Sequence, residues 1–372
     1  MKPLFLFGTL RFLPLLETVL GTLDHLSMTH AELPGFLVRS VDEGPFPMIV
    51  SAPGGKTTGL LVQGLRQTDF DRLDFYEGAF GYIAQQVVLA DGQEALVYFP
   101  QPDLWTPHGE WSFEEWRDQY GALSIHAARE AMSYHGVKPP AEVGAMFPMI
   151  RSRAWSRMNA MNSKHGALTL SGTVEITEQR RPYANYFTLE EYDLRHDRFD
   201  GSLSPEVSRA VFISSDAALV LPYDPHRDRV LLVEQVRLGP VARGDRAVWQ
   251  LEPIAGRVDA GESAEQAARR EAFEEAGLEL QALEPVAEAY CSPGSSSEFY
   301  YIYVGLADLA DEVAGLGGLE AEDEDIRSHL VSFDVLMEMC AKLEISNAPL
   351  ILACYWLAHH RDRLRNGADD TL

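Results

Sequence analysis

The sequence predicts a two-domain protein that mixes helices and strands, in the α+β or α/β class. Its 372 residues exceed the roughly 250 to 300 residues at which a single hydrophobic core stops growing. Short apolar runs separated by turn residues fill the first hundred residues, and similar runs return after about residue 168. We therefore expect a front domain at residues 1–105, a helical connector at 106–170 and a back domain at 171–366.

The composition is that of a globular protein, with 46% hydrophobic and 23% charged residues. A net charge of −25 argues against nucleic acid or an anionic membrane as a partner, since both require a basic surface. No run reaches the roughly 18 apolar residues of a membrane span. Three cysteines without CxxC spacing disfavour a disulfide framework or a thiolate zinc site, so we expect a reducing, cytoplasmic location.

In the front domain, the strand-like runs are "PLFLFG", "GLLVQGL", "YIAQQVVL" and "EALVYF". Asp91 and Gly92 separate the last two, a pair that favours a β-hairpin turn. Ser112 and Glu115 then form a capping-box pattern, and helical spacing continues to about His135. The segment from 136 to 170 is either a helical connector or part of one of the two cores.

In the back domain, the strand-like runs are "LTLSGTVEIT", "FTLEEYDLRH", "AVFISSDAALVLPY", "RVLLVEQVRL" and "EFYYIYVGL". Alternating or continuous apolar residues of this length are typical of half-buried and buried strands. A charged, helix-like segment interrupts the series, and an amphipathic helix at about residues 348–365 follows it.

The charged segment, "GRVDAGESAEQAARREAFEEAGL" at residues 256–278, crowds glutamates on one helix. Glu271 and Glu275 lie four residues apart and share a face, with Glu274 beside them. Like charges at this spacing repel each other. A hard divalent cation such as Mg²⁺, which prefers carboxylate oxygens, would offset the repulsion.

This segment resembles the Nudix box, matching it at Gly256, Glu262, Arg270, Glu271, Glu274, Glu275 and Gly277. The resemblance implies an α/β/α sandwich with a mixed sheet, and Mg²⁺ or Mn²⁺ held by Glu271, Glu275 and the Ala255 carbonyl. We expect Gly256 to allow a tight turn after its strand, and Arg270 to pair with a box glutamate. Ala272 departs from the usual larger aliphatic residue.

Within the Nudix family, residues 172–366 look most similar to the ADP-ribose pyrophosphatases, which carry a proline where this chain has Pro293. The resemblance implies that Tyr186 stacks on adenine and that Glu298 binds the terminal ribose. It also implies that Arg209 and Arg237 bind phosphate, a task suited to the planar guanidinium fork. The relatives are homodimers, so a homodimer is expected.

An acidic run, "EAEDEDIRSH", resembles the mobile catalytic loop of that subfamily. Glu322 would be the general base, with Glu274 as the alternative, and Glu324 would help to hold metal. The implied reaction hydrolyses ADP-ribose to AMP and ribose 5-phosphate. Two alternatives stay open: hydrolysis of another nucleoside diphosphate sugar such as ADP-glucose, and a non-catalytic ADP-ribose sensor. A weaker likeness to Nudix proteins of tellurite resistance explains no chemistry.

The front domain resembles the gamma-glutamylcyclotransferase-like, or AIG2-like, proteins, whose fold is a small β-barrel with helices. The match consists of the loop Gly8, Thr9 and Leu10, then Glu77 and Tyr82. A glycine loop of this kind presents backbone N–H groups to an anion. The resemblance implies that Glu77 accepts a proton from the amine of a gamma-glutamyl substrate. A binding or scaffolding role without catalysis is the alternative.

Overall fold

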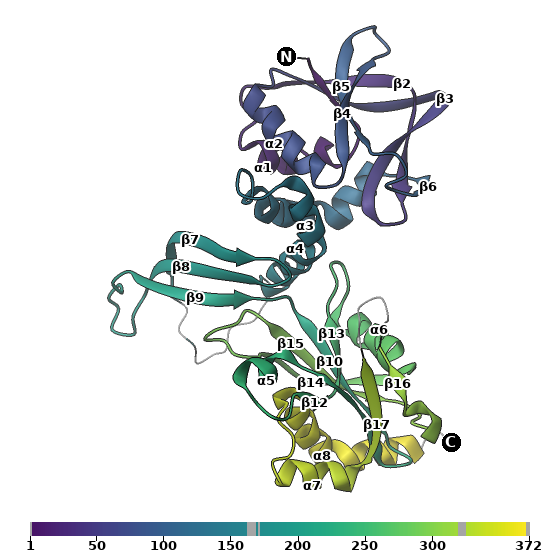
Figure 1. Ribbon diagram of the computed structural model, residues 1–372, viewed down its shortest axis with the longest axis vertical. Helices are drawn as coiled ribbons and strands as arrows, with labels where there is room; N and C mark the ends of the chain where they lie inside the picture. Colours follow the sequence, from purple (N-terminus) through teal and green to yellow (C-terminus); the bar gives the residue numbers. More distant parts are fainter. Residues whose placement is uncertain (1, 162–168, 170–171, 319–324, 370–372) are drawn as a thin grey trace. The chain divides into compact units, whose positions relative to one another are not determined.

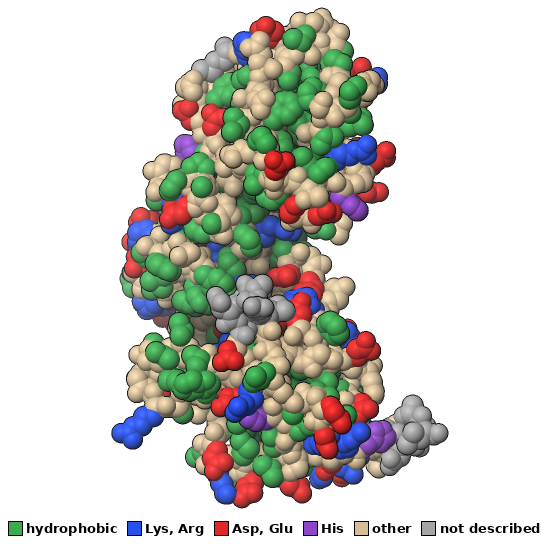
Figure 2. Space-filling view, turned by 45° about the vertical axis from the view of Figure 1, so that its right-hand side comes forward, with side chains coloured by type: hydrophobic (Ala, Val, Ile, Leu, Met, Phe, Trp, Pro, Cys, Tyr) green, Lys and Arg blue, Asp and Glu red, His purple; other side chains and the backbone are tan. Residues whose placement is uncertain are grey.

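The computed structural model describes residues 2–161, 169, 172–318 and 325–369. The chain divides into two compact units, Met1–Ser163 and Lys164–Leu372, which are drawn in Figure 1. Within the described residues, we find no helix with the length and apolar character needed to cross a membrane. On the face drawn in Figure 2, acidic and basic side chains are interspersed, so the negative charge is not gathered there in one patch.

The front unit is built on one sheet with the strand order β4-β5-β1-β3-β2-β6. Strand β1 runs parallel to β5 and antiparallel to β3. Val88 pairs with Glu94 across the turn at Asp91 and Gly92, which confirms the predicted hairpin. Among the described residues, the path ends at β4 and β6, so the expected small barrel is an open one. The strands are β1 (Leu4–Leu6), β2 (Ser27–Val41), β3 (Gly44–Gln63), β4 (Tyr82–Val88), β5 (Glu94–Pro100) and β6 (Pro107–Glu110).

Helices of the front unit pack beside this sheet and against one another. The Ser112 hydroxyl caps α3 by accepting a hydrogen bond from the Glu115 amide at 3.3 Å, as the capping pattern predicts. Arg153 of α4 and Glu130 of α3 form a fully buried ion pair at 2.6 Å. The segment predicted as a connector therefore contributes to the core of this unit, while the three domain boundaries stay predictions. The helices are η1 (Thr9–Arg11), α1 (Leu13–Leu20), α2 (Gln67–Gly78), α3 (Phe113–Met132) and α4 (Pro140–Ala160).

The back unit contains a mixed eight-stranded sheet with the order β14-β15-β10-β11-β17-β16, to which β12 and β13 add by pairing with β11 and β10. Strands β10 and β15 are parallel, whereas the other pairings in this sheet are antiparallel. The strands are β10 (Ala217–Asp224), β11 (Arg229–Val236), β12 (Trp249–Glu252), β13 (Ile254–Arg257), β14 (Ala282–Tyr290), β15 (Phe299–Leu306), β16 (Leu316–Gly317) and β17 (Ile326–Ser332).

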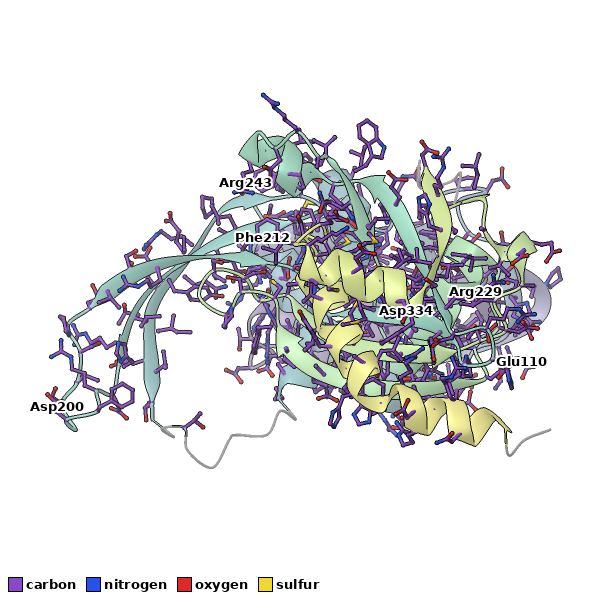
Figure 3. The ribbon with its side chains drawn as sticks, turned by 90° about the horizontal axis from the view of Figure 1, so that it is seen from below. Glu110, Asp200, Phe212, Arg229, Arg243 and Asp334 are labelled. Atoms are coloured by element: carbon purple, nitrogen blue, oxygen red, sulfur yellow. The ribbon has the colours of Figure 1, made fainter. Side chains whose placement is uncertain are left out.

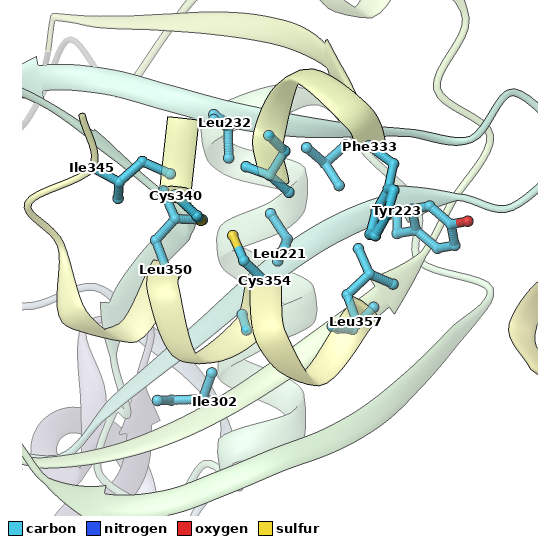
Figure 4. Packing of buried hydrophobic residues seen from close by; sticks show 14 of the residues in the cluster. Leu221, Tyr223, Leu232, Ile302, Phe333, Cys340, Ile345, Leu350, Cys354 and Leu357 are labelled. Carbon is cyan, nitrogen blue, oxygen red and sulfur yellow. The ribbon is translucent and has the colours of Figure 1, made fainter. Parts of the chain in front are cut away.

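Helices cover both faces of this sheet, as predicted for an α/β/α sandwich. Figure 4 shows Leu221, Tyr223 and Ile302 of the strands packed with Leu350 and Leu357 of α8. Alternate residues of β10 point to the opposite face, where α6 contacts β10 and β13. The helices are α5 (Leu238–Arg243), α6 (Ala264–Ala276), η2 (Asp311–Val313), α7 (Phe333–Ala341) and α8 (Ala348–Asp369).

A separate three-stranded antiparallel sheet precedes the main one, formed by β7 (Val174–Ala184), β8 (Thr188–His196) and β9 (Val207–Ile213). Figure 3 labels Asp200 at its far end and Phe212 at the end near the main sheet. The Phe212 amide donates a hydrogen bond to the Ser295 carbonyl at 2.9 Å, which anchors this end. The run from 210 to 223, which looks like one strand in the sequence, is therefore divided between two sheets.

Candidate functional site

The glutamate helix α6 has defined ends that fix which glutamates face the sheet. The Ser263 hydroxyl accepts from the Gln266 amide at 3.2 Å, and the Gln266 side chain accepts from the Ser263 amide at 2.8 Å. Gly277, with a φ of 63°, ends the helix in the left-handed conformation that favours glycine. Glu275 is only 3% exposed, so this carboxylate lies on the buried face.

Gly256 allows the Glu271 carboxylate to approach the backbone of the main sheet. The glycine lies inside β13, opposite Ala218 of β10, and is not among the described glycines with positive φ. A Cβ atom at this position would overlap the Glu271 carboxylate. The predicted tight turn at Gly256 is therefore wrong, because the strand continues through it and the missing side chain makes room for a carboxylate instead.

Arg270 connects the glutamates of the box. Its guanidinium contacts Glu271 at 2.6 Å, Glu274 at 3.0 Å and Glu262 at 3.0 Å, which confirms the predicted pairing. Partial burial by itself lowers the pKa of Arg270, but the hydrogen bonds that it donates to Glu262 and the negative charge of Glu271 outweigh burial and raise the pKa. The repulsion between the glutamates is thus already offset by a cation of the chain itself.

A cavity of about 350 Å³ brings together most of the residues predicted for the site. Tyr186, Arg237 and Glu298 line it, together with Ala255, Glu271 and Glu274. Glu275 is not among the lining residues and lies buried behind them. The cavity is further lined by Ala217, Leu219, Glu252, Pro253, Gly256, Arg257, Asp259, Arg270, Tyr300, Asn347 and Pro349.

The donor set at one end of this cavity fits a divalent cation. The Glu271 carboxylate lies against the Gly256 backbone, and Ala255 lines the cavity next to it. These are hard oxygen donors of the kind that Mg²⁺ and Mn²⁺ prefer. Among the described residues, no group of three or more acids, histidines or cysteines is arranged to hold a metal ion. Instead, Glu271 and Glu274 form ion pairs with Arg270.

Arg237 is positioned by two residues that the sequence reasoning missed. Arg237 directly precedes α5, and its Nε and Nη2 atoms lie 2.7 and 2.6 Å from the same oxygen of Glu252. The other Glu252 oxygen accepts a hydrogen bond from the side-chain Nδ2 atom of Asn347 at 3.2 Å. Glu252 is 7% exposed, and a lone glutamate at the end of a strand gives no sequence signal for such a role.

Tyr186 and Glu298 come from segments next to two different sheets but line the same cavity. Tyr186 is in the turn between β7 and β8, and its ring packs edge-on against Phe187 at 4.7 Å. Glu298 directly precedes β15, where its carboxylate accepts a hydrogen bond from the Tyr300 hydroxyl at 3.0 Å.

Besides Glu275, three predicted residues are not found at the cavity in the described part of the chain. Arg209 pairs with Tyr192 in the small sheet, and its guanidinium donates to the neighbouring Ser208 carbonyl at 2.7 Å. It is not among the lining residues. Glu322 and Glu324 lie outside the described residues.

In the front unit, the glycine loop packs on a proline held by a tyrosine. A Cβ atom at Gly8 would lie 3.0 Å from the Pro47 side chain, and the Tyr82 hydroxyl donates to the Pro47 carbonyl at 2.9 Å. Thr9 begins η1, in which Leu10 is buried. The loop is therefore tied to the start of β4 through Pro47.

Glu77 lies in the last turn of α2, close to the same tyrosine. Burial raises the pKa of Glu77 to about 8. Burial first, and then the charge of Glu77, raise the pKa of Tyr82. Glu77 therefore lies near Tyr82, which in turn contacts Pro47 beside Gly8. A carboxyl group with this pKa can exchange a proton near neutral pH.

Comparisons with known protein families match both units. The NUDIX domain model matches residues 214–354, and the model described as gamma-glutamyl cyclotransferase, AIG2-like, matches residues 4–114.

Curated relatives match the back unit. The ADP-ribose pyrophosphatase of Escherichia coli (strain K12) is 42% identical over 193 residues, which are 52% of this chain and 91% of the relative. That of Haemophilus influenzae is 36% identical over 186 residues, 50% of this chain and 85% of the relative. A GDP-mannose pyrophosphatase of Escherichia coli O1:K1 is 30% identical over 173 residues, 46% of this chain and 88% of the relative.

Proposed function

The chain belongs to the Nudix hydrolases, and from this premise we propose that it hydrolyses ADP-ribose to AMP and ribose 5-phosphate. The observation that supports this most strongly is the cavity lined by two box glutamates, Glu271 and Glu274, together with Arg237, Tyr186 and Glu298. The two ADP-ribose pyrophosphatases named above are also more similar to it than the GDP-mannose pyrophosphatase. We further propose that it acts as a cytoplasmic homodimer.

We propose Mg²⁺, with Mn²⁺ as a substitute, as the cofactor held by Glu271, Glu275 and the Ala255 carbonyl, with Glu324 as a further ligand. When bound, the cation supplies positive charge that neutralises the pyrophosphate oxygens and acidifies water at the site. The remaining work falls to side chains that position the substrate, as in phosphoryl transfer generally.

We match the side chains that line the cavity with different parts of the substrate. Arg237 would exchange part of its contact with Glu252 for phosphate oxygens, which its planar fork can bind in bidentate fashion. Tyr186 offers a half-exposed ring for the adenine, and the Glu298 carboxylate is an acceptor for ribose hydroxyls. We propose a further phosphate contact for Arg209, which one chain does not supply and a partner subunit could.

The general base is proposed to be Glu322, with Glu274 as the alternative. Glu274 lines the cavity and lies 3.0 Å from Arg270, an ion pair that orients its carboxylate. A base must reach the proton that it removes, so substitution of each glutamate separately distinguishes the two candidates.

The test is product analysis with purified full-length protein and ADP-ribose, with and without Mg²⁺. We expect AMP and ribose 5-phosphate only when the metal is present. Parallel assays with ADP-glucose and GDP-mannose define the substrate class. If either of them is hydrolysed faster than ADP-ribose, that compound is the preferred substrate and the ADP-ribose proposal is wrong. Tight, metal-independent binding of ADP-ribose without any product would contradict hydrolysis and support the sensor.

For the front unit we propose a second activity, the cyclisation of a gamma-glutamyl amine to 5-oxoproline. The supporting observation is Glu77, whose raised pKa of about 8 suits a general base near neutral pH. It would take a proton from the substrate's α-amine, whose nitrogen then attacks the γ-carbonyl. As the bond between the γ-carbon and the leaving nitrogen breaks, Glu77 would return the proton to that nitrogen, and the amine departs. Release of 5-oxoproline from a panel of gamma-glutamyl amines tests this, and no release from any of them would favour the binding role.

A further inference from the structure

Two flat side chains from different sheets meet over the cavity of the back unit. Tyr186 comes from the turn between β7 and β8, and Arg257 is the last residue of β13. The Arg257 guanidinium lies over the Tyr186 ring, 5.0 Å from its centroid. Its Nη1 atom also donates a hydrogen bond to the Tyr186 hydroxyl. Both residues line the cavity.

The backbone of Arg257 is fixed to the glutamate helix. Its carbonyl accepts a hydrogen bond from Arg270 Nη2 at 2.9 Å, and the preceding residue is Gly256, against which Glu271 lies. The Cα atom from which the Arg257 side chain extends is therefore held beside the glutamates of the box, while its guanidinium can still move.

Tyr186 is supported on its own side by further aromatic rings. Phe187 packs edge-on against it at 4.7 Å, and Phe187 in turn contacts Phe212 at 4.8 Å. The Phe212 amide is hydrogen-bonded to the Ser295 carbonyl, in the loop that precedes β15 of the main sheet. The Tyr186 ring is thus backed by packed residues while it stays 51% exposed, an arrangement suited to contact with a ligand.

We propose that Arg257 is the second wall of the nucleobase subsite, so that the base binds between its guanidinium and the Tyr186 ring. This rests on the proposed function, since it assumes a nucleoside diphosphate substrate. Guanidinium planes stack on aromatic faces, and bases stack on both aromatic rings and guanidinium planes. Stacked layers lie about 3.4 Å apart, so the guanidinium must withdraw by roughly 2 Å from its 5.0 Å position to admit a base.

A clamp of this kind recognises the π-face of a base rather than its hydrogen-bonding edge. Stacking tolerates different bases because every base has a π-face. We therefore expect Arg257 to favour nucleotides over phosphates that lack a base, with a smaller effect on the choice between bases.

The test compares Arg257→Met and Arg257→Lys with the native chain. A matched control is Arg243→Met on α5, whose side chain is 80% exposed and does not line the cavity; Figure 3 labels it. Calorimetric titration with AMP and, separately, with ribose 5-phosphate is done in a chelator. Circular dichroism melting verifies that each variant is folded.

Both Arg257 variants should bind AMP about tenfold more weakly, because lysine keeps the charge but lacks the planar face. Their affinity for ribose 5-phosphate should not change, and the KM for ADP-ribose should rise about tenfold with kcat within about twofold. Arg243→Met should match the native chain. Native affinity for AMP in Arg257→Lys, or an equal loss for both ligands, would overturn the clamp.

The clamp and the proposed function fail in distinguishable ways. If the native chain releases no AMP from ADP-ribose but binds AMP in an Arg257-dependent manner, the clamp stands and the hydrolysis proposal is wrong. If AMP is released and the Arg257 variants bind it like the native chain, hydrolysis stands and the clamp is wrong.

Discussion

Glutamates serve both candidate sites of this chain, but their surroundings differ. On α6, Glu271 and Glu274 share Arg270 and line an open polar cavity. In the front unit, Glu77 is half-buried and close enough to Tyr76, Tyr82 and Tyr98 to act on them by its charge, and burial raises its own pKa to about 8. An arginine balances the charge of a carboxylate and orients it, so that a metal ion must compete with the arginine, whereas burial raises the pKa of a carboxyl group toward neutral pH, where it can exchange a proton. The environment, rather than the residue type, therefore distinguishes the metal-binding role that we propose for the α6 glutamates from the proton-transfer role that we propose for Glu77.

The largest effect should follow from removing a charge in the α6 site. We expect Glu275→Gln to lower kcat/KM for ADP-ribose about a thousandfold, since metal-dependent charge stabilisation amounts to several kcal/mol and each 1.36 kcal/mol is tenfold. Glu265→Gln, on the same helix but exposed, is the control and should keep native activity. Isotherms for Mg²⁺ binding give the second readout, and equal metal affinity in Glu275→Gln and the native chain would contradict its role as a ligand.

Next in size is the response of the front unit to pH. Because the pKa of Glu77 is raised in the folded state, its contribution to stability is fully present below about pH 4.5 and is lost as pH rises through about 8. We expect a loss of about 3 kcal/mol over this range, after allowing for partial exposure. Hydrogen exchange of the front-unit amides at pH 5 and pH 9 measures it.

Glu77→Gln separates this effect from the rest of the chain. The variant should lack the pH-dependent loss, should release 5-oxoproline at least about a hundredfold more slowly, and should hydrolyse ADP-ribose at the native rate. A front unit whose protection changes equally with pH in both proteins would show that Glu77 is not the titrating group.

A smaller effect is expected from Gly256→Ala. The new Cβ would displace the Glu271 carboxylate, which is the end of a flexible side chain, so the fold should persist while activity falls about thirtyfold. Gly239→Ala is the control, because nothing lies within 4 Å of its Cβ position. Steady-state kinetics and melting temperature are measured together. Native activity in Gly256→Ala would mean that catalysis does not depend on the position of the Glu271 carboxylate against β13.

The smallest effect concerns the phosphate contact. Arg237→Met should raise the KM for ADP-ribose about tenfold, with a smaller change in kcat, since one charge-assisted hydrogen-bonding group is lost. It should also lower the melting temperature, because Glu252 is buried and loses its ion pair. An unchanged KM would show that Arg237 does not contact the substrate. A lower melting temperature without a change in KM would mean that its role is structural.

Local patterns in the sequence were sufficient to predict the features that depend on local spacing. The box spacing specifies the face of α6, and Asp91 with Gly92 specifies the hairpin between β4 and β5. Tyr186, Arg237 and Glu298 were identified through family resemblance, and the fold brings them to one cavity.

Features that depend on contacts between distant segments were not predictable in this way. A glycine at residue 256 is compatible with a turn or with close packing, and only the position of Glu271 distinguishes them. Glu252 and Arg257 acquire their partners from other elements. Helical spacing after Ser112 predicts α3, but periodicity does not say which element covers its apolar face.

The contacts of Arg270 have a consequence for the protein without its metal. Sites that depend on an ion for charge balance unfold when a chelator removes it. Here three glutamates of the box share a guanidinium, and the Arg257 carbonyl fixes it in place. An incoming cation must therefore compete with a resident one for Glu271. We expect the chain to stay folded in a chelator. Binding and release of the metal should then change the occupancy of the site without changing the fold.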